Sequence, residues 1–237
     1  MRFSQLAINC QQPLDGYNVS RVFNLIECSI EKGSDEYNKC IAKAHELAEL
    51  VNTAAANNAE LSRLPKRRAN DAIMGVLAEE GWLQFINSRF SKIASYTPFD
   101  DPHAQIDIQL NKGQMIEIRS SFVKNGVKFA ICNGRYNFKN IGPYSNTVKP
   151  GEVQKNLYLA VLFNTPKDEL LQGDRINFTL IGGSTWQMMV NIGYDDPLEP
   201  KDALVPIKSR YRVIQMKDVL DVEQVINNIA SLGYNRQ

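Results

Sequence analysis

The sequence predicts an α/β fold in which helices cover a central sheet. Up to about residue 92, apolar residues recur mostly at the spacing of helices, and beyond it they alternate with polar residues as strands do. The run from Leu157 to Phe163 is apolar throughout, which is typical of a central strand buried on both faces. The 237 residues, 43% of them hydrophobic, are sufficient for a substantial core.

The N-terminal part is predicted to be helical. Apolar residues at helical spacing predict one helix over about 18–32 and a second from about residue 35 into the fifties. We therefore expect residues 1–65 to form a helical extension packed on an α/β domain that comprises residues 66–237.

A third helix is expected over about 69–90, directly after the most basic run of the chain, Pro65-Lys66-Arg67-Arg68. Such a run is either a solvated helix start or, beside a nuclease centre, an anchor for phosphate groups. The helix also carries Glu79 and Glu80, flanked by apolar residues. A carboxylate at the edge of a buried stripe requires a partner, because a charge buried alone is unfavourable.

The stretch 107–121 predicts a β-hairpin that turns at Lys112-Gly113. Its alternation places apolar residues on one face and leaves Glu117 and Arg119 together on the other. Closure of the hairpin brings Asp107 near Glu117, a pair of hard oxygen ligands suited to a divalent metal. The alternative is an ordinary sheet face that carries a cross-strand ion pair.

The remaining elements follow from local pattern. A short strand is expected over 93–96, and the long segment 133–152 is expected to be a loop, a kind of segment that is often functional. The other predicted elements are strands over 127–132, 175–181 and 211–215, a turn over 182–185, a short helix over 186–190 and a closing helix over 219–232.

Composition excludes several classes of chemistry. The chain has four cysteines without a CxxC motif and two histidines, so neither Cys/His zinc sites nor a disulfide framework is indicated. No apolar run is long enough to span a bilayer, and the start of the chain has no secretory pattern, so we expect a cytoplasmic protein. A net charge of +1 neither requires nor excludes nucleic-acid binding. Chemistry here is therefore expected to rest on carboxylates and cations.

The predicted elements follow one another in this order: a helix with a Glu, a strand with an Asp, a strand with a Glu-x-basic pattern, and a buried strand. This order resembles the PD-(D/E)XK nuclease superfamily, which includes type II restriction endonucleases. The family pattern Gly-x-x-Ala-Glu is matched by Gly75-Val76-Leu77-Ala78-Glu79, and the family's Asp and Glu fall on Asp107 and Glu117. The resemblance covers roughly residues 70–232. It implies a restriction-endonuclease-like mixed sheet flanked by helices, and a metal-dependent DNA endonuclease.

The resemblance also implies a set of site residues. Asp107, Glu117 and the Ile118 carbonyl would bind Mg²⁺, for which Mn²⁺ can substitute, with Glu79 (or Glu80, if the helix is rotated) completing the set. The implied partners are double-stranded DNA and a second copy of the chain, with no membrane. The residues expected to contact DNA are Lys66, Arg67, Arg68, Ser120, Ser121, Arg135 and Lys139.

One position departs from the family, because Arg119 stands where its lysine is expected. Arginine stays protonated and can stabilise charge on a phosphate, but it cannot serve as a base. Lys128 or Lys155 would have to supply the missing ammonium. If neither reaches the site, the alternatives are a weak nuclease, a catalytically inactive DNA- or protein-binding module on the same fold, or a purely structural hairpin.

Overall fold

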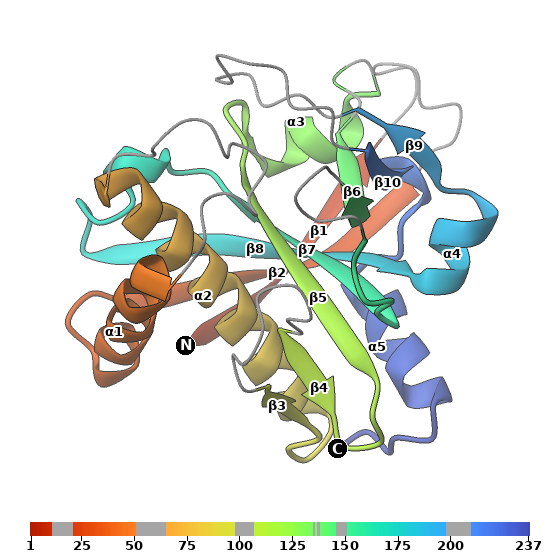
Figure 1. Ribbon diagram of the computed structural model, residues 1–237, viewed down its shortest axis with the longest axis horizontal. Coiled ribbons are helices and arrows are strands. Elements are labelled where there is room, and N and C mark those ends of the chain that lie inside the picture. The colour runs from red at the N-terminus through yellow and green to blue at the C-terminus, as the bar shows by residue number, and fades with distance from the viewer. Residues whose placement is uncertain are drawn as a thin grey trace.

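The computed structural model describes residues 1–10, 21–50, 65–97, 107–134, 136, 138–145, 151–197 and 210–237, and its centre is a mixed seven-stranded sheet (Figure 1). The strand order is β1-β2-β8-β7-β5-β4-β3. β5 and β7 are parallel, and the other neighbours are antiparallel. The strands are β1 (Arg2–Cys10), β2 (Arg21–Glu31), β3 (Ala94–Tyr96), β4 (Ile108–Leu110), β5 (Met115–Phe122), β7 (Leu157–Phe163) and β8 (Arg175–Thr185).

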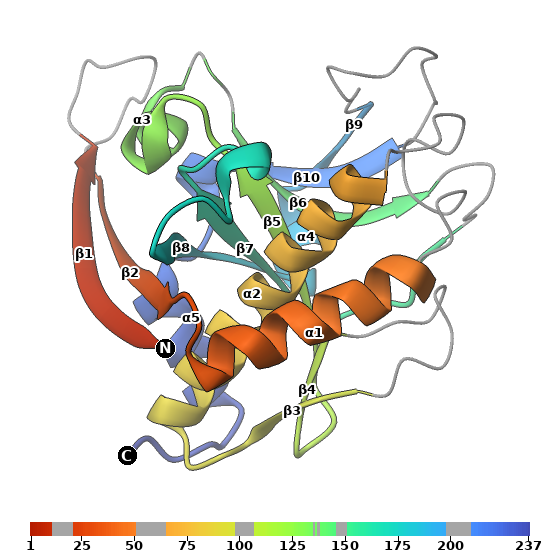
Figure 2. The ribbon, with the colours of Figure 1, turned by 90° about the vertical axis from the view of Figure 1, so that its left-hand side faces the viewer.

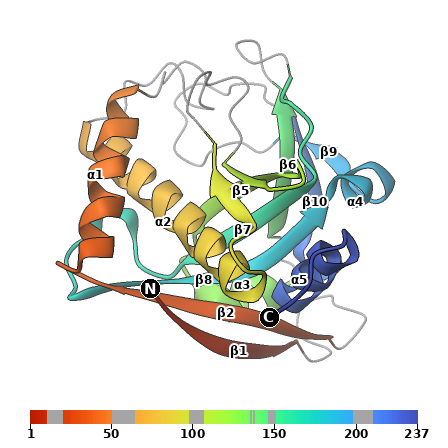
Figure 3. The same ribbon diagram turned by 90° about the horizontal axis from the view of Figure 1, so that it is seen from below.

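Helices and a smaller sheet surround this sheet. The smaller sheet has the order β6-β10-β9, and Figures 2 and 3 both show α1 and α2 lying side by side. The remaining elements are α1 (Asp35–Leu50), α2 (Pro65–Arg89), α3 (Gly126–Cys132), α4 (Trp186–Asn191), α5 (Val222–Ser231), β6 (Lys139–Ser145), β9 (Tyr194–Asp196), β10 (Arg210–Gln215) and the 3₁₀ helices η2 (Lys167–Glu169) and η3 (Met216–Asp218).

The central strand β7 is buried on both faces, as its uninterrupted apolar sequence predicts. Leu157, Leu159 and Val161 join the core cluster that includes residues of α1, α2 and α5. Tyr158 and Ala160 join a second cluster with residues of α3 and β10. Successive side chains therefore point into opposite cores, which is the period of an extended strand.

The prediction of a helical N-terminal extension is correct for α1 and wrong for residues 21–31. That segment forms β2, which pairs with β1 on one side and β8 on the other, so it belongs to the same large sheet as the later strands. Phe23, Leu25, Cys28 and Ile30 are buried in this strand. Hydrogen bonding from both sides outweighs the local helical spacing. One of the two partner strands, β8, is remote in sequence, so the local pattern carries no sign of it.

Two further predictions are wrong beyond β5. The strand expected over 127–132 is the helix α3, in which Val127, Ala130 and Ile131 form a buried face at helical spacing. Gly126, with a φ of +86°, begins that helix. The loop expected over 133–152 contains β6, which pairs with β10. Residues 135, 137 and 146–150 of this segment lie outside the described residues.

The end of β8 corrects the turn expected at residues 182–185. Both glycines of that segment continue the strand, and Gly183 exchanges two backbone hydrogen bonds with Leu220, of 2.9 and 2.8 Å. Thr185 then caps α4 as expected, its hydroxyl accepting from the Met188 N–H. Asp221 caps α5 in the same way, in a reciprocal capping box with Gln224.

Cys10 and Cys132 form a disulfide that joins β1 to the end of α3, so the expectation of no disulfide was wrong for this pair. Cys28 and Cys40 are free and buried. A search of the described helices finds none with the length and apolar character needed to cross a membrane.

Candidate active site

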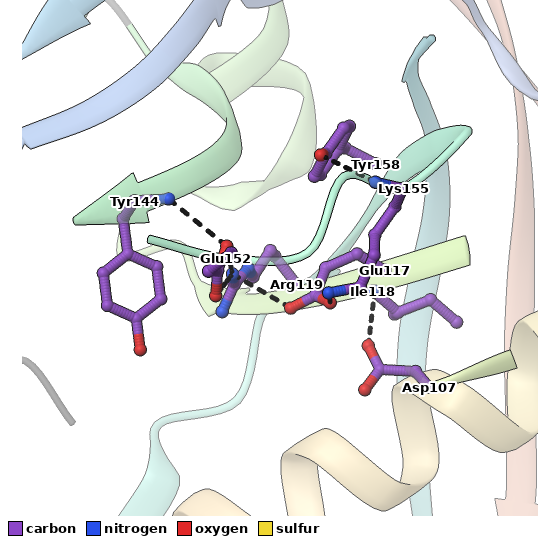
Figure 4. Close-up of polar contacts among 8 residues, drawn as sticks. All are labelled: Asp107, Glu117, Ile118, Arg119, Tyr144, Glu152, Lys155 and Tyr158. Carbon is purple, nitrogen blue, oxygen red and sulfur yellow. Dashed lines mark hydrogen bonds and ion pairs between the residues drawn. The ribbon is translucent and has the colours of Figure 1, made fainter. Parts of the chain in front are cut away.

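The hairpin of β4 and β5 is confirmed, and it carries the first two candidate ligands. Gly113, with a φ of +93°, lies in the turn, and Ile108 pairs with Ile116. This register places Asp107 beside the middle of β5. The Ile118 N–H donates a hydrogen bond to Asp107 Oδ2 (2.6 Å), so this carboxylate is held next to the residue that follows Glu117 (Figure 4).

The third candidate carboxylate comes from α2, and it is Glu79. The negative charges of Glu79 and Glu117 both raise the pKa of Asp107. Glu80 instead accepts hydrogen bonds from the Tyr96 hydroxyl and the Gln84 amide. Lys43 of α1 balances Glu79, with its Nζ 3.2 Å from Glu79 Oε2.

Mutual repulsion among these carboxylates changes their acidity. Burial raises the pKa of Asp107 well above its ordinary value, and the negative charges of Glu117 and Glu79 raise it further. The hydrogen bond from Ile118 opposes this shift without cancelling it. Burial also raises the pKa of Glu79, with Lys43 opposing and Glu117 adding to the shift. The site therefore concentrates negative charge.

Lys155 is the lysine that reaches the site. It lies in the segment just before β7, its side chain is 2% exposed, and its Nζ is 3.5 Å from Glu117 Oε2. Its backbone N–H donates to the Tyr158 hydroxyl (3.1 Å), which fixes the segment against the buried strand. Lys128, the other candidate, is exposed on α3, a helix that packs against β1, β7 and η3.

Arg119, at the position where the resemblance implies a lysine, contacts two carboxylates. Its Nη2 lies 2.9 Å from Glu117 Oε1, and it donates to both oxygens of Glu152, at 3.1 and 3.2 Å. Burial lowers the pKa of Arg119, but Glu117, Glu152 and Asp107 outweigh burial and raise it overall. Its guanidinium also lies 5.3 Å from the centre of the Tyr144 ring. Arg119 is thus a fully charged group that is already paired.

A cleft of about 400 Å³ opens beside this centre. Arg119 and Lys167 contribute its cations, and Lys167 also pairs with Asp71. The other lining residues are Met74, Ile118, Ser120, Ile141 and Tyr211. A larger hollow of about 500 Å³ lies between α1 and α2, where Lys43 and Glu80 are among its lining residues. Neither hollow is lined by Asp107 or Glu117, but Ile118 and Arg119 line the smaller cleft, so we place the candidate chemistry beside that cleft.

The structure gathers only some of the expected DNA-contacting residues. Ser120 lines the cleft, and Ser121 follows it, half-buried, on β5. Lys139 pairs with Asp196 in the smaller sheet. Arg135 and the side chains of the basic run 66–68 lie outside the described residues, although α2 begins at Pro65.

The donor chemistry of the site fits a hard divalent cation, since Asp107, Glu117 and Glu79 are oxygen ligands that repel one another. Within the described ranges, however, no group of three or more His, Cys, Asp or Glu side chains stands close enough together to hold a metal ion. Arg119 and Lys155 neutralise Glu117 instead.

Sequence reasoning missed Glu152 and Lys43 as members of this charge cluster. Glu152 precedes Lys155 by three residues, and both precede β7, which is buried along its whole length. Two opposite charges directly before a buried strand are a usable signal, because the strand carries its first residues into the interior of the protein. Lys43 gave no such signal, since it resembles any other charged residue of an amphipathic helix.

Comparison with known proteins identifies no family. No family model matches the sequence, and no solved structure matches the chain. Among curated proteins, the chain is similar to the uncharacterized protein MJECS01 of Methanocaldococcus jannaschii. The two are 22% identical over an alignment of 272 positions, which covers 94% of this chain and 97% of that protein.

Proposed function

We propose that this chain is a metal-dependent DNA endonuclease with a restriction-endonuclease-like fold. The observation that best supports this function is the position of Lys155, whose buried ammonium lies 3.5 Å from Glu117. The family places a lysine beside this glutamate, and Lys155 supplies that charge from a different point of the chain. The mixed sheet with helices against it is compatible with the same proposal.

The residues have separable roles under this proposal. Asp107, Glu117 and the Ile118 carbonyl would hold Mg²⁺ (or Mn²⁺), with Glu79 as the further carboxylate. When bound, the ion would lower the pKa of a water molecule and neutralise negative charge on the phosphate. The Lys155 ammonium would donate hydrogen bonds to the attacking water or the phosphate, and Arg119 would stabilise the added charge of the transition state. Ser120, in the cleft wall, would bond the DNA backbone.

Cleavage assays test the proposal. The purified chain, with Mg²⁺ or Mn²⁺, is incubated with plasmid, linear and modified double-stranded DNA. Asp107→Ala, Glu117→Ala and Lys155→Ala are each expected to lower the cleavage rate by about 100-fold or more, the usual loss when a catalytic group is removed. Lys128→Ala, a change of exposed lysine on α3, is the matched control and is expected to cleave like the wild type. Cleavage that survives both carboxylate substitutions would remove this site from the proposal.

A second candidate function is a DNA- or protein-binding module that holds no metal. It is favoured by the pairing of Glu117 with two cations and by the lack, among the described residues, of an assembled metal-binding group. Calorimetric titration with Mn²⁺ separates the two functions. An enzyme is expected to show binding heat that Asp107→Asn removes, and a binding module is expected to show none.

A further inference from the structure

Glu152 is a buried carboxylate that accepts hydrogen bonds from two different elements. Its side chain is 2% exposed, and it lies in the segment before β7, three residues ahead of Lys155. Both of its oxygens accept from Arg119, and Oε2 also accepts from the Tyr144 N–H of β6 (3.2 Å). Figure 4 shows Glu152 between Tyr144 and Arg119. The smaller sheet thus fixes the carboxylate that holds Arg119.

Arg119 divides its charge between Glu152 and the proposed metal ligand Glu117. The same nitrogen, Nη2, contacts both carboxylates. If Glu152 lost its charge, Glu117 would be the remaining charged partner of these two, and Arg119 would pair with Glu117 alone. Glu117 also faces Lys155. A divalent cation that binds Glu117 has to compete with both of these cations.

The local charge balance points in the same direction. The carboxylates of Glu79, Asp107, Glu117 and Glu152 face the cations of Lys43, Arg119 and Lys155. With all seven groups ionised, the cluster carries one more negative than positive charge, an excess that a bound cation would offset. Neutralising Glu152 would remove that excess and leave Arg119 free to occupy Glu117.

We propose that Glu152 is a positioning residue that holds the Arg119 guanidinium and thereby keeps Glu117 available to a divalent metal ion. The proposal rests on the proposed function. It goes further, because it assigns control of metal affinity at the β4–β5 hairpin to Glu152, a residue that bonds to the smaller sheet. Glu152 itself contacts neither the metal nor the substrate in this scheme.

The test is Mn²⁺ binding to the full chain, measured by calorimetry for the wild type and Glu152→Gln. Glu152→Gln is expected to weaken Mn²⁺ binding by about 10- to 100-fold, because loss of a residue that positions the metal ligands typically lowers metal affinity by this factor. Glu169→Gln, a change of an exposed carboxylate on η2, is the matched control and is expected to leave the affinity unchanged. Glu152→Asp, which keeps the charge on a shorter side chain, is expected to fall between the wild type and Glu152→Gln, and it carries the test if the amide variant does not fold.

An Arg119→Gln background distinguishes positioning from a general effect of charge. If Glu152 acts through Arg119, then Glu152→Gln loses most of its effect once Arg119 is neutral. An unchanged affinity of Glu152→Gln, or an equal loss in the Arg119→Gln background, would overturn the inference and leave the nuclease proposal standing. Absence of Mn²⁺ binding to the wild type would overturn both.

Discussion

Asp107 is a residue whose negative charge is unfavourable where the fold holds it. The Ile118 N–H fixes its carboxylate, while Glu117 and Glu79 repel it. Such an arrangement destabilises the folded chain and is common where carboxylates are gathered for a positively charged ligand. At the same scale, Lys155 supplies an ammonium beside Glu117, and Arg119 remains tied to Glu152. Two cations, Arg119 and Lys155, thus contact Glu117, and Arg119 also pairs with Glu152.

Asp107→Asn is expected to raise the free energy of unfolding at neutral pH, because it removes a charge that burial and two neighbouring carboxylates make unfavourable. The pKa of Asp107 is raised in the folded chain above its ordinary value of 3.8, so the folded state retains a proton that the unfolded state has lost. Stability therefore falls as pH rises from 3.8 through the folded pKa. The amide oxygen can still accept from Ile118, so the substitution removes the charge and keeps the hydrogen bond.

Urea unfolding at several pH values, with EDTA present, measures this effect. The advantage of Asp107→Asn is expected to shrink toward pH 3.8, where the wild type also becomes neutral in the unfolded state. Asp174→Asn, at an exposed turn position, is the control and is expected to change stability little. A variant less stable than the wild type at pH 7 would contradict the predicted repulsion.

At the scale of elements, the junction of β7, β8 and the segment before α5 depends on a glycine. Gly183 lies so close to β7 that an added Cβ would be 2.1 Å from the Tyr158 carbonyl oxygen and 2.8 Å from Leu159 Cα. Its backbone also pairs with Leu220, one residue before the Asp221 cap of α5. Backbone atoms cannot yield as a flexible side chain can, so this position requires glycine.

Gly183→Ala is expected to destabilise the chain by about 2 kcal/mol or more, because it forces β7 and β8 apart at the centre of the sheet. Gly75→Ala is the matched control: nothing lies within 4 Å of the added Cβ, and the residue is inside α2. In a helix, alanine is favoured over glycine by about 0.5–1 kcal/mol, so the control is expected to gain stability. Chemical denaturation of both variants checks the opposite signs, and equal effects would show that the close approach is unimportant.

At the scale of the whole molecule, one covalent bond connects the N-terminal strand to the middle of the chain. Cys10 and Cys132 are 122 residues apart, so the disulfide closes a long loop in the unfolded chain. The remaining thiols are buried, and burial raises the pKa of Cys40 to about 12, which suppresses its reactive thiolate form. Redox effects on stability should therefore arise from the Cys10–Cys132 pair.

Reduction of this disulfide is expected to lower the free energy of unfolding by about 2–5 kcal/mol, because a long loop regains its freedom in the unfolded state. Thermal unfolding with and without dithiothreitol measures the change. A Cys10→Ser/Cys132→Ser variant should match the reduced wild type and should not respond to the reductant. A response that persists in the double variant would assign the effect to another group.

Elements whose residue pattern is local could be predicted from the amino-acid sequence. The hairpin around Gly113, the buried strand β7 and the helix α2 follow from alternation, from an unbroken apolar run and from helical spacing. The pairing of Asp107 with the middle of β5 followed from the same alternation. These features were predictable because burial repeats with the period of the backbone itself.

Features that depend on residues far apart in the chain could not be predicted from the sequence. Residues 21–31 form a strand because they lie between β1 and β8. Folding also places Glu79 rather than Glu80 near Asp107, Lys155 rather than Lys128 near Glu117, and Glu152 beside Arg119. It also joins Cys10 to Cys132. Periodicity indicates which face of an element is buried but not which neighbouring element covers that face. The role of a charged side chain likewise depends on the residue that it contacts in the folded protein.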